Sequence, residues 1–170
     1  MQRIRYFVHE LPALVARPLS WLPPLLARIV VGWTFASTGW GKLGNLEQVI
    51  GFFAELGIPF PELQAPFVAF TELTCGLLLV AGLATRIAAL PLIGTMVVAI
   101  ATAQWASIDG AAALFGLVET LYIVLFAWLT VAGPGPVSLD ALVERAFQPR
   151  ESDPSPVLPS ALRPTMPARS

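Results

Sequence analysis

Four long apolar runs constrain the fold of this chain more than any other feature. They cover residues 22–40, 66–83, 87–105 and 111–132, and each is close to the roughly 20 residues that a helix needs to cross about 30 Å of hydrocarbon. The whole chain is 56% hydrophobic and 12% charged, which is about half the charge of an ordinary soluble domain. The sequence therefore predicts an all-α integral membrane protein, a four-helix bundle from residue 22 to about residue 140 that is surrounded by membrane lipid.

The segments outside the spans differ from one another in character. In the long first loop, apolar side chains at helical spacing over 47–56 precede a proline-containing turn, so we expect a short interfacial helix that covers one mouth of the bundle. Segment 1–21 has apolar residues at helical spacing, which favours a second interfacial helix over a frayed tail. Segment 141–170 forms a tail that is rich in proline from about residue 148, and this composition predicts disorder there.

The positive residues predict the orientation of the bundle. If the spans alternate in direction, the arginines outside them all fall on one side of the membrane: Arg3, Arg5, Arg17, Arg86, Arg145, Arg150, Arg163 and Arg169. The opposite side carries Lys42 and the acidic residues of the first and third loops: Glu47, Glu55, Glu62 and Asp109. By the positive-inside rule, both termini are expected in the cytoplasm, with the chain in the cytoplasmic (inner) membrane.

Composition also excludes several classes of function. A net charge of −1 offers no basic surface for nucleic acid. One cysteine and one histidine are too few for a structural zinc, an iron–sulfur cluster or a haem, so no metal site and no covalently bound cofactor is expected. Any redox chemistry would take its electron carrier from a partner protein or from a diffusible cofactor.

Three ionisable residues lie inside the apolar runs: Arg28, Glu72 and Glu119. A charge in the middle of a membrane helix costs roughly 2.5–3.5 kcal/mol on insertion scales, so these residues are expected to pair or to serve a function. At about 1.5 Å per residue, Glu72 and Glu119 lie roughly 9 Å and 12 Å from the same end of their helices, in one layer. Lys42 ends the first helix at that layer and leans toward it, whereas Arg28 is deeper and leans away. We expect a buried polar cluster with Lys42 as first counter-ion and Arg28 as second.

Each of these charges has a structural alternative. Arg28 could extend to the cytoplasmic interface, and Lys42 could be an interfacial anchor. The two acids could form structural ion pairs, or they could bind a ligand or protons.

Taken together, several short motifs make the chain resemble the DoxX family of small bacterial membrane proteins, over residues 27 to 140. They are Arg-Ile-Val-Val-Gly at 28–32, Gly-Trp-Gly-Lys-Leu at 39–43, Gly-Ile-Pro at 57–59, Thr-Glu-Leu at 71–73 with Gly76 and the leucines 77–79, Gly-Leu-Ala-Thr-Arg at 82–86, Glu119, Gly-Pro-Gly at 133–135 and Ser-Leu-Asp at 138–140. The resemblance implies a four-helix bundle in the cytoplasmic membrane, often tied to oxidoreductases. One branch of the family resembles the small subunit of a thiosulfate:quinone oxidoreductase. Arg28, Lys42, Glu72 and Glu119 match its charged positions.

Two functions from different classes follow. In the first, the chain is a membrane subunit of a quinone-linked oxidoreductase. The acids exchange protons with a quinone while a partner oxidoreductase supplies the electrons. The chain alone is not expected to be a self-sufficient enzyme. In the second, it is a non-catalytic anchor or assembly protein that recruits a soluble partner. A transporter is less favoured, because no inverted repeat or broken helix is evident in the sequence.

Overall fold

The computed structural model describes residues 18–147. The interfacial helix expected within segment 1–21 and the proline-rich tail expected from about residue 148 lie almost entirely outside the described residues.

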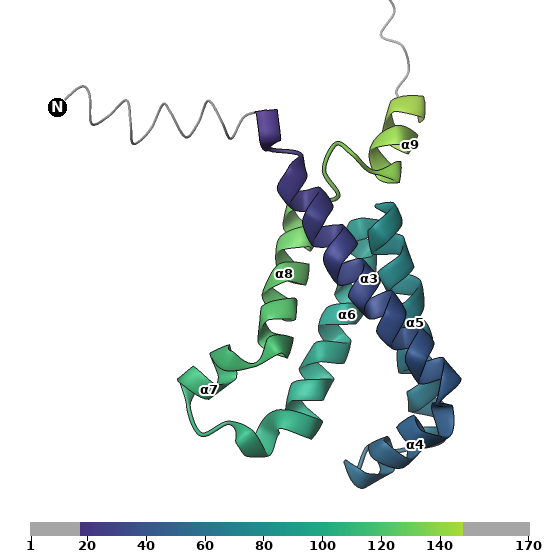
Figure 1. Ribbon diagram of the computed structural model, residues 1–170, viewed down its shortest axis with the longest axis vertical. Coiled ribbons are helices and arrows are strands. Elements are labelled where there is room, and N and C mark those ends of the chain that lie inside the picture. Colours follow the sequence, from purple (N-terminus) through teal and green to yellow (C-terminus); the bar gives the residue numbers. More distant parts are fainter. Residues whose placement is uncertain (1–17, 148–170) are drawn as a thin grey trace, which may run out of the picture.

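The regular structure of the described part is entirely helical, which confirms the predicted all-α fold. Four helices form the bundle: α3 (Leu22–Gly44), α5 (Pro61–Ala81), α6 (Thr85–Ala99) and α8 (Val118–Ala132). The short helices are α4 (Leu46–Glu55), the π-helical turn η2 (Ile100–Gln104), the 3₁₀ turn η3 (Trp105–Ser107), α7 (Ala111–Gly116) and α9 (Leu139–Phe147). Figure 1 shows α4 and α7 at one end of the bundle and α9 at the other.

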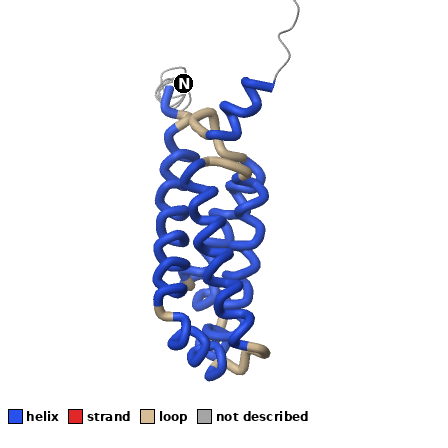
Figure 2. The backbone as a smooth tube through the Cα atoms, turned by 90° about the vertical axis from the view of Figure 1, so that its right-hand side faces the viewer, coloured by secondary structure: helices blue, strands red, loops and turns tan. Residues whose placement is uncertain are grey.

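Helix α4 is the short helix expected in the first loop, and it begins within one residue of the predicted segment 47–56. The chain leaves it through Gly57, whose φ of +70° suits a residue without a Cβ, and enters α5 at Pro61. At its other end, α5 stops at Gly82, which is also left-handed. The break at Gly82 allows α6 to turn back beside α5. Figure 2 shows the long helices of the bundle running along one common axis.

Helices α3 and α5 pack closely because glycines face each other across their interface. A Cβ atom on Gly32 would lie 2.8 Å from the carbonyl oxygen of Gly76, and one on Gly39 would lie 2.6 Å from the carbonyl oxygen of Ala69. Lipid gives no hydrophobic drive for helices to associate, so this close approach is what makes dispersion effective. The small residues Gly32 and Gly39 of α3 therefore face α5.

The centre of the bundle is an aromatic and aliphatic core to which α3, α5, α6 and α8 all contribute buried side chains. The Phe35 ring makes edge-to-face contacts with Tyr122 and Phe126, at centroid distances of 5.2 Å and 5.0 Å. Leu92 and Leu129 are fully buried beside them. The outer surface is apolar instead of charged, with Trp33 and Trp40 among its exposed side chains.

The predicted spans differ in how regular they are. Helix α5 and the segment Thr85–Ser107 are each long and apolar enough to cross a membrane, while α8 is a shorter apolar helix. The fourth run, expected as one span over 111–132, is divided at Leu117, where the backbone is extended between α7 and α8. Helix α6 passes into a π-helical turn at Ile100, so both helices depart from regular α geometry toward the same end.

Candidate ligand site at Lys42 and Glu72

An ion pair joins α3 to α5 within the apolar bundle. Lys42, in the last turn of α3, places its Nζ 2.7 Å from Oε1 of Glu72 in the middle of α5. The Glu72 side chain is 2% exposed and the Lys42 side chain is 27% exposed, so the pair reaches from the interior toward the surface. This is the pairing that helix rise and side-chain direction indicated.

The pair stands in the wall of a cavity of about 670 Å³, a volume typical of sites for small organic ligands. The cavity lies between the end of α3, α4, α5, α6 and η2. Most of its lining is apolar: Val49, Phe52, Phe53, Leu56, Ile58, Phe67, Val68, Pro91, Gly94, Met96, Val98, Ala99 and Ala103. Its charged residues are Lys42 and Glu72, and its neutral polar residues are Gln48, Gln64, Thr71, Thr95 and Thr102.

One oxygen of the buried carboxylate has no partner. Glu72 Oε1 accepts from Lys42, while Oε2 is buried without a hydrogen bond among the described residues. An unpaired buried polar atom costs about 1–3 kcal/mol, and more for a charged group. Glu72 itself lines the cavity, and a buried carboxylate oxygen without a partner has the capacity to hold a proton.

The part of the cavity wall that α6 forms contains a proline and a glycine, and a π-helical turn follows it. Pro91 lies inside the helix, and a Cβ atom on Gly94 would meet nothing within 4 Å. The π-helical turn that follows brings Thr102 and Ala103 to the same cavity. A π-helical turn has i→i+5 hydrogen bonds, one residue longer than those of an α-helix, and such turns are frequent at functional sites.

Glu119 makes a different contact. It lies in the first turn of α8 and is half-buried, and it accepts a hydrogen bond from Gln104 Nε2 at 3.4 Å. It does not line the cavity at Glu72, and among the described residues it forms no ion pair. Gln104 ends the π-helical turn, so Glu119 connects to that cavity wall through η2 instead of through Lys42.

Arg28 was predicted to be a second counter-ion of Glu72, but the structure does not bring the two residues together. It is 1% exposed and donates from Nη2 to the carbonyl oxygen of Val137, in the segment that follows α8. Its Nε and Nη1 have no partner among the described residues, and a Cβ on Gly82 would collide with Nη1. Arg28 therefore holds the turn after α8 against the end of α5, at the opposite end of the bundle from Glu72.

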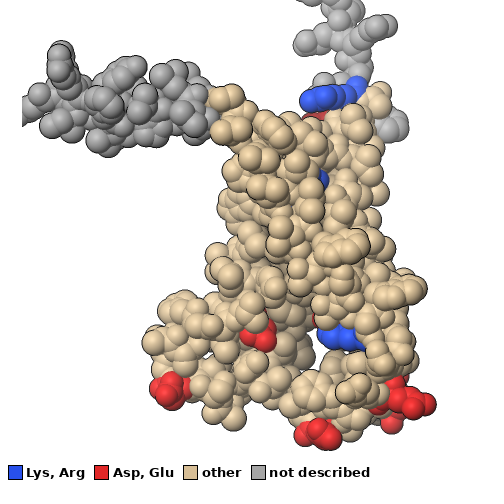
Figure 3. All heavy atoms as spheres, in the orientation of Figure 1, with Lys and Arg blue, Asp and Glu red and all other residues tan. Residues whose placement is uncertain are grey.

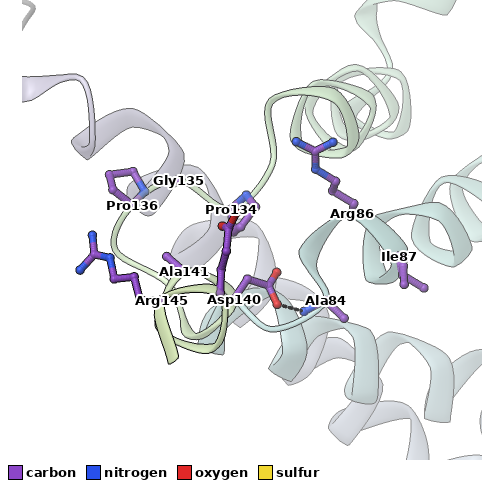
Figure 4. Close-up of a pocket in the computed structure, with 10 residues that line it drawn as sticks. Ala84, Arg86, Ile87, Pro134, Gly135, Pro136, Asp140, Ala141 and Arg145 are labelled. Carbon is purple, nitrogen blue, oxygen red and sulfur yellow. Dashed lines mark hydrogen bonds between the residues drawn. The ribbon is translucent and has the colours of Figure 1, made fainter. Parts of the chain in front are cut away.

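A second cavity, of about 780 Å³, lies beside α9 (Figure 4). Basic and acidic residues both line it, including Arg86, Asp140 and Arg145. The Asp140 carboxylate is already engaged, since it accepts from Ala84 N at 2.8 Å and from Thr85 N at 3.2 Å, where α6 begins. This cluster docks α9 on the start of α6.

Charges divide between the two ends of the molecule (Figure 3). Acidic side chains gather at the end with α4 and α7, where Glu47, Glu55, Glu62 and Asp109 are exposed. Lys and Arg side chains lie beside α9 at the other end, together with the acids Asp140 and Glu144, and one basic group lies near α4.

Sequence reasoning missed most of the cavity lining. The polar residues Thr71, Thr95 and Thr102 carry no net charge, so they did not stand out within apolar runs. The spacing of Pro91, Thr95, Val98 and Thr102 places them on one face of a helix, and that was the available signal.

Comparisons with known proteins agree with this architecture. A model of the DoxX family matches residues 24–105. An uncharacterized membrane protein of Mycobacterium tuberculosis is 31% identical over 134 residues, which make up 69% of this chain and 80% of that protein. The inner membrane protein YphA of Escherichia coli is 30% identical over 145 residues, 82% of this chain and 99% of that protein. CatD of Bacillus subtilis, named as a candidate oxidoreductase, is 39% identical over 77 residues, 43% of this chain and 56% of that protein. No solved structure matches.

The motifs, the helical bundle and these relatives together show that the chain is a membrane protein of the DoxX family.

Proposed function

We propose that this chain is a membrane subunit of a quinone-linked oxidoreductase, and that Lys42 and Glu72 hold the polar head of a quinone in the cavity between α4, α5 and α6. The observation that carries the proposal is the buried ion pair in an apolar cavity wall, with Glu72 Oε2 unpartnered. Partly satisfied buried acids in a membrane mark ligand sites and proton pathways more often than structural pairs.

The chemistry of a quinone matches this wall. A quinone head is a flat apolar ring with two carbonyl oxygens, which need hydrogen-bond donors, and a mostly apolar lining around one ion pair suits such a head. Reduction to the quinol takes up two electrons and two protons. The electrons come from a partner oxidoreductase and the two protons from water at the open side of the cavity. Lys42 Nζ donates a hydrogen bond to one carbonyl oxygen, and the Glu72 carboxylate takes up each proton from that water and passes it to the reduced ring.

The charge distribution supports a location in the cytoplasmic membrane with both termini in the cytoplasm. Arg86 and Arg145 lie at the α9 end together with Asp140 and Glu144, whereas the four exposed acids of the first and third loops lie at the opposite end. Under the positive-inside rule, the cavity then lies in the outer half of the bundle. The similarity to CatD, named as a candidate oxidoreductase, supports the redox setting over the shared region.

The test is purification of the full chain from native membranes in a mild detergent, with bound quinone and quinone turnover measured in the purified complex. Glu72→Gln removes the exchangeable proton and keeps the shape, so bound quinone and turnover should fall at least about tenfold. Glu62→Gln is the matched control, because Glu62 is an exposed acid in the first turn of the same helix, and it should change neither quantity.

Full turnover in Glu72→Gln would overturn the proposal. If that result came with loss of a co-purifying partner on removal of residues 149–170, the alternative of a non-catalytic anchor that recruits a soluble partner would take its place.

A further inference from the structure

We infer that the Lys42–Glu72 cavity is filled from within the bilayer by an amphiphile with one long apolar tail, and that the tail lies between α4 and α6. This inference rests on the proposed function for the identity of the polar head, but it does not require a redox step. It assigns the path of entry and the shape of the ligand.

The position of the opening follows from how the helices pack. Helix α4 packs chiefly on α5, with a smaller contact to α3, while α6 packs on α8 and α5. Both α4 and α6 therefore flank α5, and the cavity fills the space between them. The space-filling view shows the surface hollowed beside α4 at this end of the molecule (Figure 3).

Large apolar side chains that line this cavity remain uncovered. Phe52 of α4 is 50% exposed, Phe67 of α5 is 68% exposed and Val98 of α6 is 48% exposed, so each of the three helices offers apolar surface at the cavity or its rim. A polar solute would leave this surface bare. An apolar tail packs against this surface and gains dispersion contacts with it, because transfer from lipid into the cavity brings no hydrophobic gain of its own.

The polar groups favour a ligand with a single charged or hydrogen-bonding end. The charged residues of the lining are one ion pair, Lys42 and Glu72, contributed by the end of α3 and the middle of α5. The aromatic side chains come from α4 and from the first half of α5. A head at the ion pair and a tail along the aromatic side satisfy both parts of the wall.

Gly94 offers a way to fill the cavity without disturbing the bundle. It lines the cavity, and a Cβ atom there would meet nothing within 4 Å. Gly51 of α4 is also helical and also open at its Cβ position, but it does not line the cavity. Gly94→Phe and Gly51→Phe therefore form a matched pair, in which both add the same side chain to an open helical position.

The experiment uses the full chain in nanodiscs and an uncharged long-chain alcohol with a photoreactive group at its tail end. After illumination, the labelled residues are mapped by mass spectrometry. Labelling should concentrate on Phe52, Phe67 and Val98, and it should fall at least about tenfold in Gly94→Phe while Gly51→Phe leaves it unchanged. Labelling that is spread evenly over the outer surface, and equal in both variants, would overturn the inference.

Competition on the unaltered chain gives a second readout that does not depend on how the variants fold. Decylubiquinone should compete with the probe at a concentration at least about tenfold lower than the tailless 2,3-dimethoxy-5-methyl-benzoquinone, after correction for partition into the lipid. Equal competition by the two quinones would show that the tail makes no contact and would overturn the inference.

The two proposals fail in different ways. If labelling depends on Gly94 but the complex neither binds nor reduces quinone, the bilayer entry stands and the proposed function is wrong. If turnover depends on Glu72 but labelling is insensitive to Gly94, the proposed function stands and the path of the tail is wrong.

Discussion

Removing Lys42 should expose how strongly the buried ion pair is coupled to folding. The Nζ to Oε1 distance of 2.7 Å gives a Coulomb attraction of about 6 kcal/mol at an effective dielectric constant of 20, and about 1.5 kcal/mol in bulk water. Desolvation of Glu72 offsets part of this, and the partial exposure of Lys42 lowers it further. We therefore expect Lys42→Met to lower the free energy of unfolding by about 2–4 kcal/mol, because it leaves an acid without a counter-ion.

A double-mutant cycle separates the pair from its two members. Glu72→Gln retains an acceptor for Lys42 and should cost about 1 kcal/mol. Added to Lys42→Met, the same change should recover about 1–2 kcal/mol, because it removes the uncompensated acid, so the coupling energy of the pair should be about 2–3 kcal/mol. The assay is equilibrium unfolding by sodium dodecyl sulfate in mixed micelles, followed by tryptophan fluorescence.

Additive losses in that cycle would refute the reasoning. If the double variant equals the sum of the single ones within about 0.5 kcal/mol, Lys42 and Glu72 do not interact in the folded state. A coupling below about 1 kcal/mol is the value expected of an exposed surface pair, and it would mean that water reaches the site freely.

Two further predictions concern the packing of the bundle and the docking of α9. Gly39→Leu should destabilise the chain by about 3 kcal/mol or prevent folding, since its Cβ would overlap the backbone of Ala69. Gly41→Leu, at a position where a Cβ meets nothing within 4 Å, should be neutral in the same assay of unfolding by sodium dodecyl sulfate. Asp140→Ala should cost about 1–2 kcal/mol and speed trypsin cleavage within α9, because it removes both hydrogen bonds to the start of α6. Glu144→Ala, at an exposed position of the same helix, should leave the free energy of unfolding unchanged.

The span pattern and the helix in the first loop could be predicted because bilayer thickness and helical period fix them directly. Glycine and proline then marked the ends of α4 and α5, at Gly57, Pro61 and Gly82. The pairing of Lys42 with Glu72 could also be predicted, because it depends only on rise per residue and on the direction in which helical side chains lean.

The partner of Arg28 could not be predicted in the same way. Its guanidinium contacts Val137, 109 residues away, and that contact depends on how the turn after α8 folds back across the end of α5. The left-handed Gly82, which leaves room for the guanidinium, was a signal, but it also reads as an ordinary helix end.

The irregular ends of α6 and α8 were also beyond sequence reasoning. Gly116 marks the division of the fourth run at Leu117, but a glycine inside an apolar helix is common in membranes. The π-helical turn over 100–104 leaves no mark on hydropathy, because it keeps the chain helical. Placing Glu119 in one layer with Glu72 assumed a regular helix throughout the fourth run, and its contact with Gln104 depends on both irregularities.

An experimental structure of the chain, carried from native membranes into nanodiscs, tests the ligand site most directly. The account predicts an amphiphile in the cavity, with its polar end within hydrogen-bond distance of Lys42 Nζ or Glu72 Oε2 and its tail between α4 and α6. A structure in which Glu72 Oε2 bonds to another group of the protein, and α4 closes onto α6 with nothing between them, would contradict it.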